Sequence, residues 1–166
     1  MTIAQQLLPE FDKEMGTTRR TLERVPDEKW DWRPHPKSGT MGWLAGHLAN
    51  IPTWTNHGIE LDKLDIAPGG KPLRGSPIAT CQRVLETFDR NVAAARKAIA
   101  GASDEDLGGS WTLISNGRPI FTISRAAVLR SFVMNHMIHH RAQLGVYLRL
   151  NDISVPATYG PSADEN

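Results

Sequence analysis

Three histidines fall within six residues of the sequence, in the stretch NHMIHH from Asn135 to His140. His136 and His140 are four residues apart, and a helix places two such side chains on one face with their Cβ atoms about 5–6 Å apart. Two imidazoles in that arrangement can bind one metal ion at Zn–N distances of about 2.0–2.1 Å. His47, in the stretch GWLAGHLAN, lies among regularly spaced apolar residues and is a third candidate ligand.

Three nitrogen ligands would leave coordination positions for water or a substrate atom, which is typical of a catalytic metal site. The zincin helix motif uses the same histidine spacing but places a glutamate, its general base, directly after the first histidine. Met137 occupies that position here, which argues against a zincin-type peptidase. Alternatively, the histidines are core residues whose ring nitrogens bind to protein groups, and spacing alone leaves both interpretations open.

The elements that position these histidines are predicted by apolar residues at steps of three and four. A short hairpin or extended loop is expected in WTLISNGRPIFTI, because Asn116–Gly117 is a strong hairpin-turn signal. We therefore predict an all-α fold, a four-helix bundle with a short hairpin or loop insert before the last helix, in a single domain over residues 1–166. The predicted helices cover residues 3–25, a stretch from about Thr40 past Trp54 with a break or early end at Pro52, residues 78–99, and residues 124–150; the stretches PDEKWDWRPHPKSGT and DIAPGGKPLRGSP are predicted loops.

The composition and charge of the chain argue against several classes of protein. Lysine and arginine total 19 against 18 acidic residues, so charge gives no case for binding nucleic acid or an anionic membrane. Cys81 is the one cysteine, which excludes an internal disulfide and fits a reducing compartment. No apolar run approaches the roughly 20 residues of a membrane span, and the start of the chain does not resemble a signal peptide. We expect a cytoplasmic protein.

Five other residues have a possible role at or near the histidines. Trp30 and Trp32 could cover a pocket beside a metal, or could attach their long loop to the bundle. Tyr147 lies two turns beyond the last histidine on the same side and could place its hydroxyl near the site. His139 is rotated about 100° from that histidine, so a second-shell, dimer-contact or surface role is expected. Arg141 is expected to pair with an acidic residue on a neighbouring helix.

The histidine stretches resemble the DinB-like (DinB/YfiT) family of four-helix-bundle metalloproteins. The resemblance is carried by GWLAGHLAN and by NHMIHHRAQLGVYLRL, and it continues in KWDWRPHPKS and VPATYGPSADE. It implies that His47, His136 and His140 are the metal ligands, that zinc or nickel is the usual ion, and that a homodimer forms. Members of the family with known activity include metal-dependent thiol S-transferases and a maleylpyruvate isomerase that uses a thiol cofactor.

Two functional hypotheses follow. The first is a metal-dependent enzyme, a transferase or hydrolase, in which the ion activates a low-molecular-weight thiol or a water for attack on a small electrophilic substrate. A thiol activated in this way needs no carboxylate base, which agrees with Met137. The alternative is a non-catalytic metal-binding or sensor bundle, in which the ion is structural or is the signal.

Overall fold

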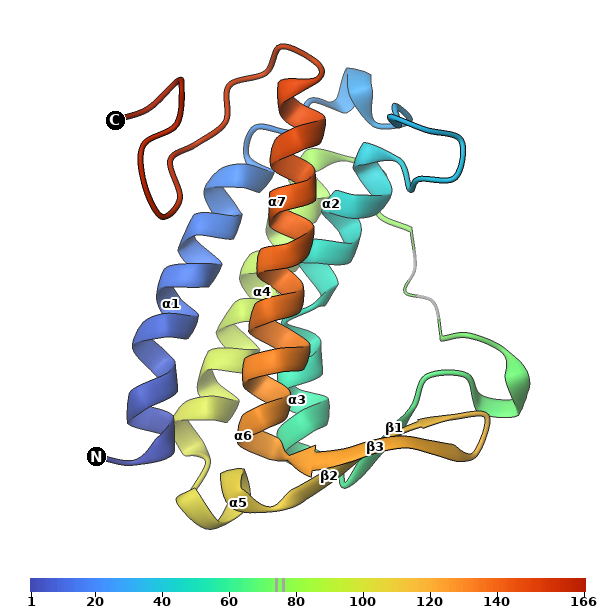
Figure 1. Cartoon of the computed structure of the whole chain (residues 1–166), viewed down its shortest axis with the longest axis vertical. Helices are drawn as coiled ribbons and strands as arrows, with labels where there is room; N and C mark the ends of the chain where they lie inside the picture. Colours follow the sequence, from blue (N-terminus) through green and yellow to red (C-terminus); the bar gives the residue numbers. More distant parts are fainter. Residues whose placement is uncertain (74, 76) are drawn as a thin grey trace.

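The computed structural model describes residues 1–73, 75 and 77–166, and in that part of the chain four long helical segments run side by side (Figure 1). Arg74 and Ser76, inside the predicted loop DIAPGGKPLRGSP, lie outside the described residues. The predicted helical bundle is confirmed. Its segments are α1 (Ile3–Leu22), α2 (Met41–Asn50) followed by α3 (Thr53–Glu60), α4 (Cys81–Gly101), and a continuous run of α6 (Arg125–Ala127), η3 (Val128–Asn135) and α7 (His136–Arg149); the short helices η1 (Asp27–Lys29), η2 (Pro68–Gly70) and α5 (Asp104–Gly108) lie in the connections.

The first and third long helices begin at side-chain caps. The Thr2 hydroxyl accepts a hydrogen bond from the Gln5 amide, and the Gln5 side chain accepts one from the Thr2 amide, which completes a capping box for α1. Thr80 caps α4 in the same position. Both helices bury an apolar stripe in one core, which includes Phe11 and Phe88, each 1% exposed. This packing holds the scaffold that carries the histidines.

The second long helix is broken at Pro52, as the sequence predicts. A proline has no amide proton and crowds the carbonyl four residues earlier, so α2 ends at Asn50 and α3 begins at Thr53. The amide of Ile51 still donates to the His47 carbonyl at 3.1 Å. His47 therefore lies in the last turn of α2, directly before the break.

The last long helix contains a π-helical stretch that the sequence analysis did not predict. η3 is a π-helix over Val128–Asn135, and α7 starts at the next residue, His136. Hydrogen bonds in a π-helix join residues five apart instead of four, and such stretches are frequent at functional sites. Apolar spacing does not distinguish a π-helical turn from an α-helical one, so it carries no signal for this stretch.

A three-stranded sheet closes one end of the bundle (Figure 1). The predicted hairpin is confirmed: β2 (Ser110–Ser115) and β3 (Arg118–Ser124) are antiparallel, and Asn116 and Gly117 turn with φ of 51° and 74°. A third strand, β1 (Lys63–Asp65), pairs parallel with β2 and was not predicted. The Asp65 carboxylate accepts hydrogen bonds from the amides of both turn residues, so β1 also fixes the hairpin turn.

The sheet has its own small core against the start of the last helix. Trp111 and Leu113 on β2 are buried with Val128, and Phe121 and Phe132 pack on them. Within the described residues, no helix is long and apolar enough to cross a lipid bilayer.

Candidate metal centre

The three predicted histidines meet in space although they come from distant parts of the chain. His47 Nε2 lies 3.2 Å from His136 Nε2, across 89 residues of sequence, and His140 Nε2 lies 2.7 Å from His136 Nε2. One nitrogen from each ring lies within 4.8 Å of the other two, so the group could hold a metal ion. All three side chains are partly exposed, which leaves the group accessible from solvent.

The donor set fits a divalent ion. Two nitrogens bound to one zinc ion at tetrahedral angles are about 3.3 Å apart, and at octahedral angles about 2.9 Å. The two measured Nε2 separations lie close to these values. Because all donors are imidazole nitrogens, the set suits zinc, nickel or another transition ion rather than magnesium or calcium, which prefer oxygen.

Gln143 fixes the tautomer of the His140 ring. Its Oε1 lies 2.7 Å from His140 Nδ1, and since an amide oxygen only accepts, His140 donates from Nδ1. A neutral His140 therefore directs a bare Nε2 lone pair at the other two histidines. Such an outer hydrogen bond is the usual way to orient a metal-binding histidine.

The surroundings keep the three imidazoles neutral. Burial, together with the neighbouring imidazoles, lowers the pKa of His47 and of His136 from 6.5 to about 4. Burial also lowers the pKa of His140, although its hydrogen bond with Gln143 opposes this shift. Only a neutral imidazole has a lone pair for a metal, so the group is in its metal-binding form at neutral pH.

Aromatic side chains that the sequence analysis did not assign to the site surround the histidines. Trp43 stacks on the His47 ring, with 5.2 Å between ring centroids and 6° between planes. Trp54 meets His47 and His136 edge-on at 5.9 Å and 5.0 Å. A signal was present, because Trp43 precedes His47 by four residues and helical spacing places both on one face.

The other predicted pocket residues, Trp30, Trp32 and Tyr147, pack around the proline-rich loop. Trp32 and Tyr147 pack edge-to-face at 5.5 Å, and the Tyr147 hydroxyl donates to the Gly39 carbonyl at 3.3 Å. Trp30 covers Gly42, where an added Cβ would lie 2.3 Å from the indole. In the described structure these three side chains attach the proline-rich loop to α2 and α7.

Neither His139 nor Arg141 belongs to the group of three histidines. His139 is exposed, with its ring 4.9 Å from the His140 ring, and is outside the group of three. Arg141 is 3% exposed, and its guanidinium lies 2.7 Å from the carboxylate of Glu14 on α1. The Tyr159 hydroxyl lies 2.9 Å from both side chains. The expected pairing of Arg141 with an acidic residue is thus present, and it joins α7 to α1.

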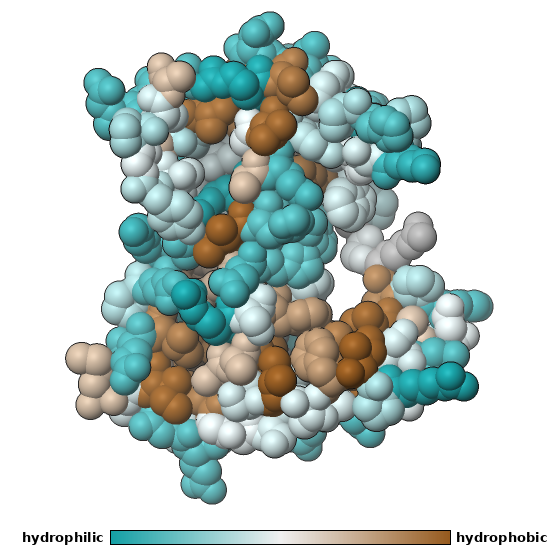
Figure 2. Space-filling view, in the orientation of Figure 1, coloured by the Kyte–Doolittle hydropathy of each residue, from teal (hydrophilic) through white to brown (hydrophobic). Residues whose placement is uncertain are grey.

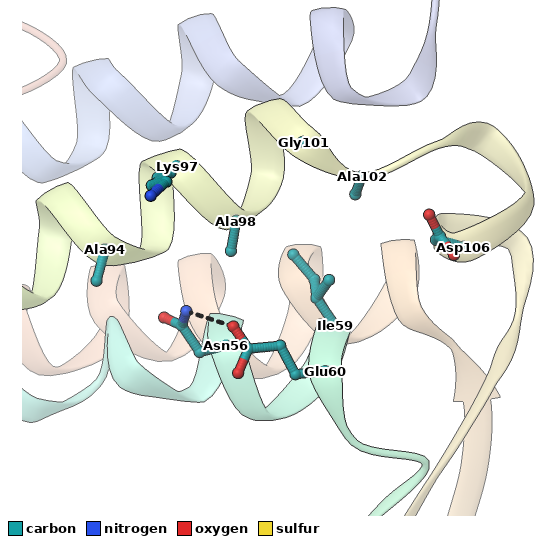
Figure 3. A pocket seen from close by; sticks show the side chains of 9 residues that line it. All are labelled: Asn56, Ile59, Glu60, Ala94, Lys97, Ala98, Gly101, Ala102 and Asp106. Carbon is teal, nitrogen blue, oxygen red and sulfur yellow. Dashed lines mark hydrogen bonds between the residues drawn. The ribbon is translucent and has the colours of Figure 1, made fainter.

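A separate cleft of about 490 Å³ lies between α3 and α4 and contains none of the three histidines (Figure 3). Three of its polar side chains are already paired: the Asn56 amide donates to the Glu60 carboxylate at 3.1 Å, and Asp106 caps α5 with Ser103. The cleft lies where α4 carries small side chains. The lining residues are Asn56, Ile59, Glu60, Ala94, Lys97, Ala98, Gly101, Ala102 and Asp106.

Comparison with known proteins identifies the family. The model of the DinB superfamily matches residues 10–144, a range that includes all three histidines. The chain belongs to the DinB superfamily. No curated protein matches this DinB protein.

Solved structures of DinB-like proteins share its fold. One from Bacillus subtilis has a TM-score of 0.69 at 16% identity, covering 92% of this chain and 97% of its own. One from Bacillus cereus has a TM-score of 0.69 at 24% identity, covering 92% and 95%. A DinB-family protein from Exiguobacterium sibiricum has a TM-score of 0.64 at 20% identity, covering 95% and 97%. At these identities the likeness shows the fold alone.

Proposed function

We propose that this DinB protein is a metal-dependent enzyme that transfers a small-molecule thiol to an electrophilic substrate. The observation that carries the proposal is the convergence of three neutral Nε2 atoms, in a group of described residues that contains no carboxylate. A site without a carboxylate base suits a nucleophile that the metal itself can deprotonate.

The residues of the chain would hold the ion and define its open side. His136 and His140 supply two nitrogens from one face of α7, and His47 supplies the third from the last turn of α2. Gln143 orients His140, and Trp43 holds the plane of the His47 ring. All three side chains are partly exposed, so a small molecule could reach the group from solvent.

When bound at the three histidines, a divalent ion would supply Lewis-acid chemistry that lowers the pKa of a small-molecule thiol, so that its sulfur would be a nucleophile at neutral pH. The thiol proton goes to solvent. In the transfer, the sulfur would form a bond to the electrophilic carbon, and the leaving group would depart with the electron pair of the bond that breaks. No protein base is required in this scheme, consistent with Met137 after the first histidine of α7.

The first experiment measures metal per chain by mass spectrometry, on protein purified without a histidine tag. We expect about one ion per chain in the wild type, and loss of that ion in His136→Ala. His139→Ala is the matched control, because this neighbouring histidine is exposed and outside the group. Stoichiometric metal in a folded variant with all three histidines changed to alanine would overturn the assignment.

A second measurement separates an enzyme from a structural or sensor site. The metal-loaded protein is screened for consumption of simple thiols with electrophiles, and its thermal unfolding is compared with and without metal. Turnover that disappears in His136→Ala supports the enzyme. No turnover of any thiol by protein that retains its metal would favour the non-catalytic alternative.

A further inference from the structure

One aromatic side chain beside the histidines is largely open to solvent. Trp43 is 56% exposed, although its indole stacks on the His47 ring and meets the His140 ring edge-on at 6.4 Å. Gly39 makes room for it, because an added Cβ there would lie 2.3 Å from the indole. A tryptophan is a large, rigid apolar surface. Here such a surface is left uncovered next to two of the three candidate ligands.

A second group of aromatic rings continues this surface toward the sheet. Trp54, beside His47 and His136, stacks on Phe132 with 4.7 Å between centroids, and Phe132 meets Phe121 of β3 at 6.1 Å. Trp54 and Phe132 are both partly exposed. Figure 2 shows apolar side chains gathered over the sheet and the α6 end of the molecule, below the hydrophilic middle of α7. The candidate centre thus borders an apolar, aromatic region.

The charge around the site selects among ligands that bind aromatic rings. The group of candidate ligands consists of three imidazoles and contains no carboxylate, and the aromatic rings packed around it, Trp43, Trp54 and Phe132, are uncharged. Three neutral imidazoles with a divalent ion carry two positive charges. This charge disfavours an ammonium group, which tryptophan can also bind, and leaves a neutral flat group as the better partner.

We propose that the ligand reaching the ion carries an uncharged aromatic group, and that this group packs on the Trp43 indole. The inference rests on the proposed function, because it places the reacting sulfur or electrophile of that same molecule at the three histidines. Trp43 is then a specificity-determining residue. It selects aromatic over aliphatic ligands of equal length, by about three- to tenfold in affinity.

The test compares two thiols on the zinc-loaded protein by calorimetry: benzyl mercaptan, and cyclohexylmethanethiol, which has the same length but no aromatic ring. We expect the wild type to bind benzyl mercaptan about three- to tenfold more tightly. Trp43→Ala should bring the ratio to about one, and Trp43→Phe should retain most of it. Using the ratio cancels any change that a variant makes in metal occupancy.

Leu150→Ala is the matched control, because Leu150 is 58% exposed on the far end of α7. Equal binding of the two thiols by the wild type, or an unchanged ratio in Trp43→Ala, overturns the inference. If neither thiol binds, the proposed function fails instead. The aromatic surface is then tested alone with 4-nitrobenzyl alcohol, which quenches indole fluorescence on contact. Saturable quenching that Trp43→Ala removes supports the surface, and its absence in the wild type overturns it.

Discussion

Lowering the pH from about 7.5 to about 5.5 tests whether the histidines are neutral before metal binds. An ordinary imidazole, with its pKa near 6.5, loses about tenfold in its neutral fraction over this interval, so three would together weaken metal binding about a thousandfold. Burial holds the pKa of His47 and of His136 at about 4, so both stay almost entirely neutral at the lower pH. The pKa of His140 is lowered as well, so its own contribution is below about tenfold.

We therefore expect zinc affinity to fall by less than about tenfold over the interval, and steeply only as the pH approaches about 4. The assay is competition for zinc with a chelator whose own affinity is known at each pH. His35→Ala serves as the control, because that ring is exposed and lies outside the group of three histidines. A fall of about a thousandfold by pH 5.5 would refute the reasoning, since it would mean that the rings are protonated like free imidazoles.

Substitutions at three places test the scaffold: the buried ion pair, the hairpin turn and the contact between Gly39 and Trp43. Arg141→Met leaves the Glu14 carboxylate buried without its partner and should cost about 3–5 kcal/mol in the free energy of unfolding by urea, whereas Glu14→Leu combined with Arg141→Met should cost much less. Gly117→Ala forces a side chain to a φ of 74° and should cost about 1–2 kcal/mol in the same assay. Gly39→Ala should move the Trp43 indole off His47, weaken zinc binding and change tryptophan fluorescence, with little effect on stability.

Each of these substitutions has an outcome that contradicts its reasoning. The buried pair is unimportant if the double replacement costs as much as Arg141→Met alone. The turn is not strained by a side chain if Gly117→Ala unfolds at the wild-type urea concentration. Unchanged fluorescence and zinc affinity in Gly39→Ala would show that Trp43 does not orient His47.

The centre was predictable because its information is local to two short stretches. The four-residue spacing of His136 and His140 fixes their common face on any helix, and His47 stands on the apolar side of its own helix. Pro52 and the Asn116–Gly117 pair act through backbone chemistry at a single position. Such signals need no knowledge of what packs nearby, and the structure confirms the helix break and the turn.

The strand β1 and the π-helical stretch were missed for different reasons. β1 has three residues, and it is a strand because β2 lies beside it. For Trp32 the sequence left a pocket role and a loop-attaching role open, and its packing on Tyr147 of α7 agrees with the second. The π-helical turn was missed because its apolar spacing resembles that of an α-helix over one or two turns.

The origin of the three histidines gives the centre a mechanical consequence. A metal held by His47 and His136 would join residues 89 positions apart. By the loop-entropy relation for cross-links, closing a loop of that length restricts the unfolded chain by about 4.6 kcal/mol. Cys81 is the one cysteine and cannot form an internal disulfide. The ion would thus act as a removable cross-link between α2 and α7. The concentration of available metal would then affect the stability of the fold.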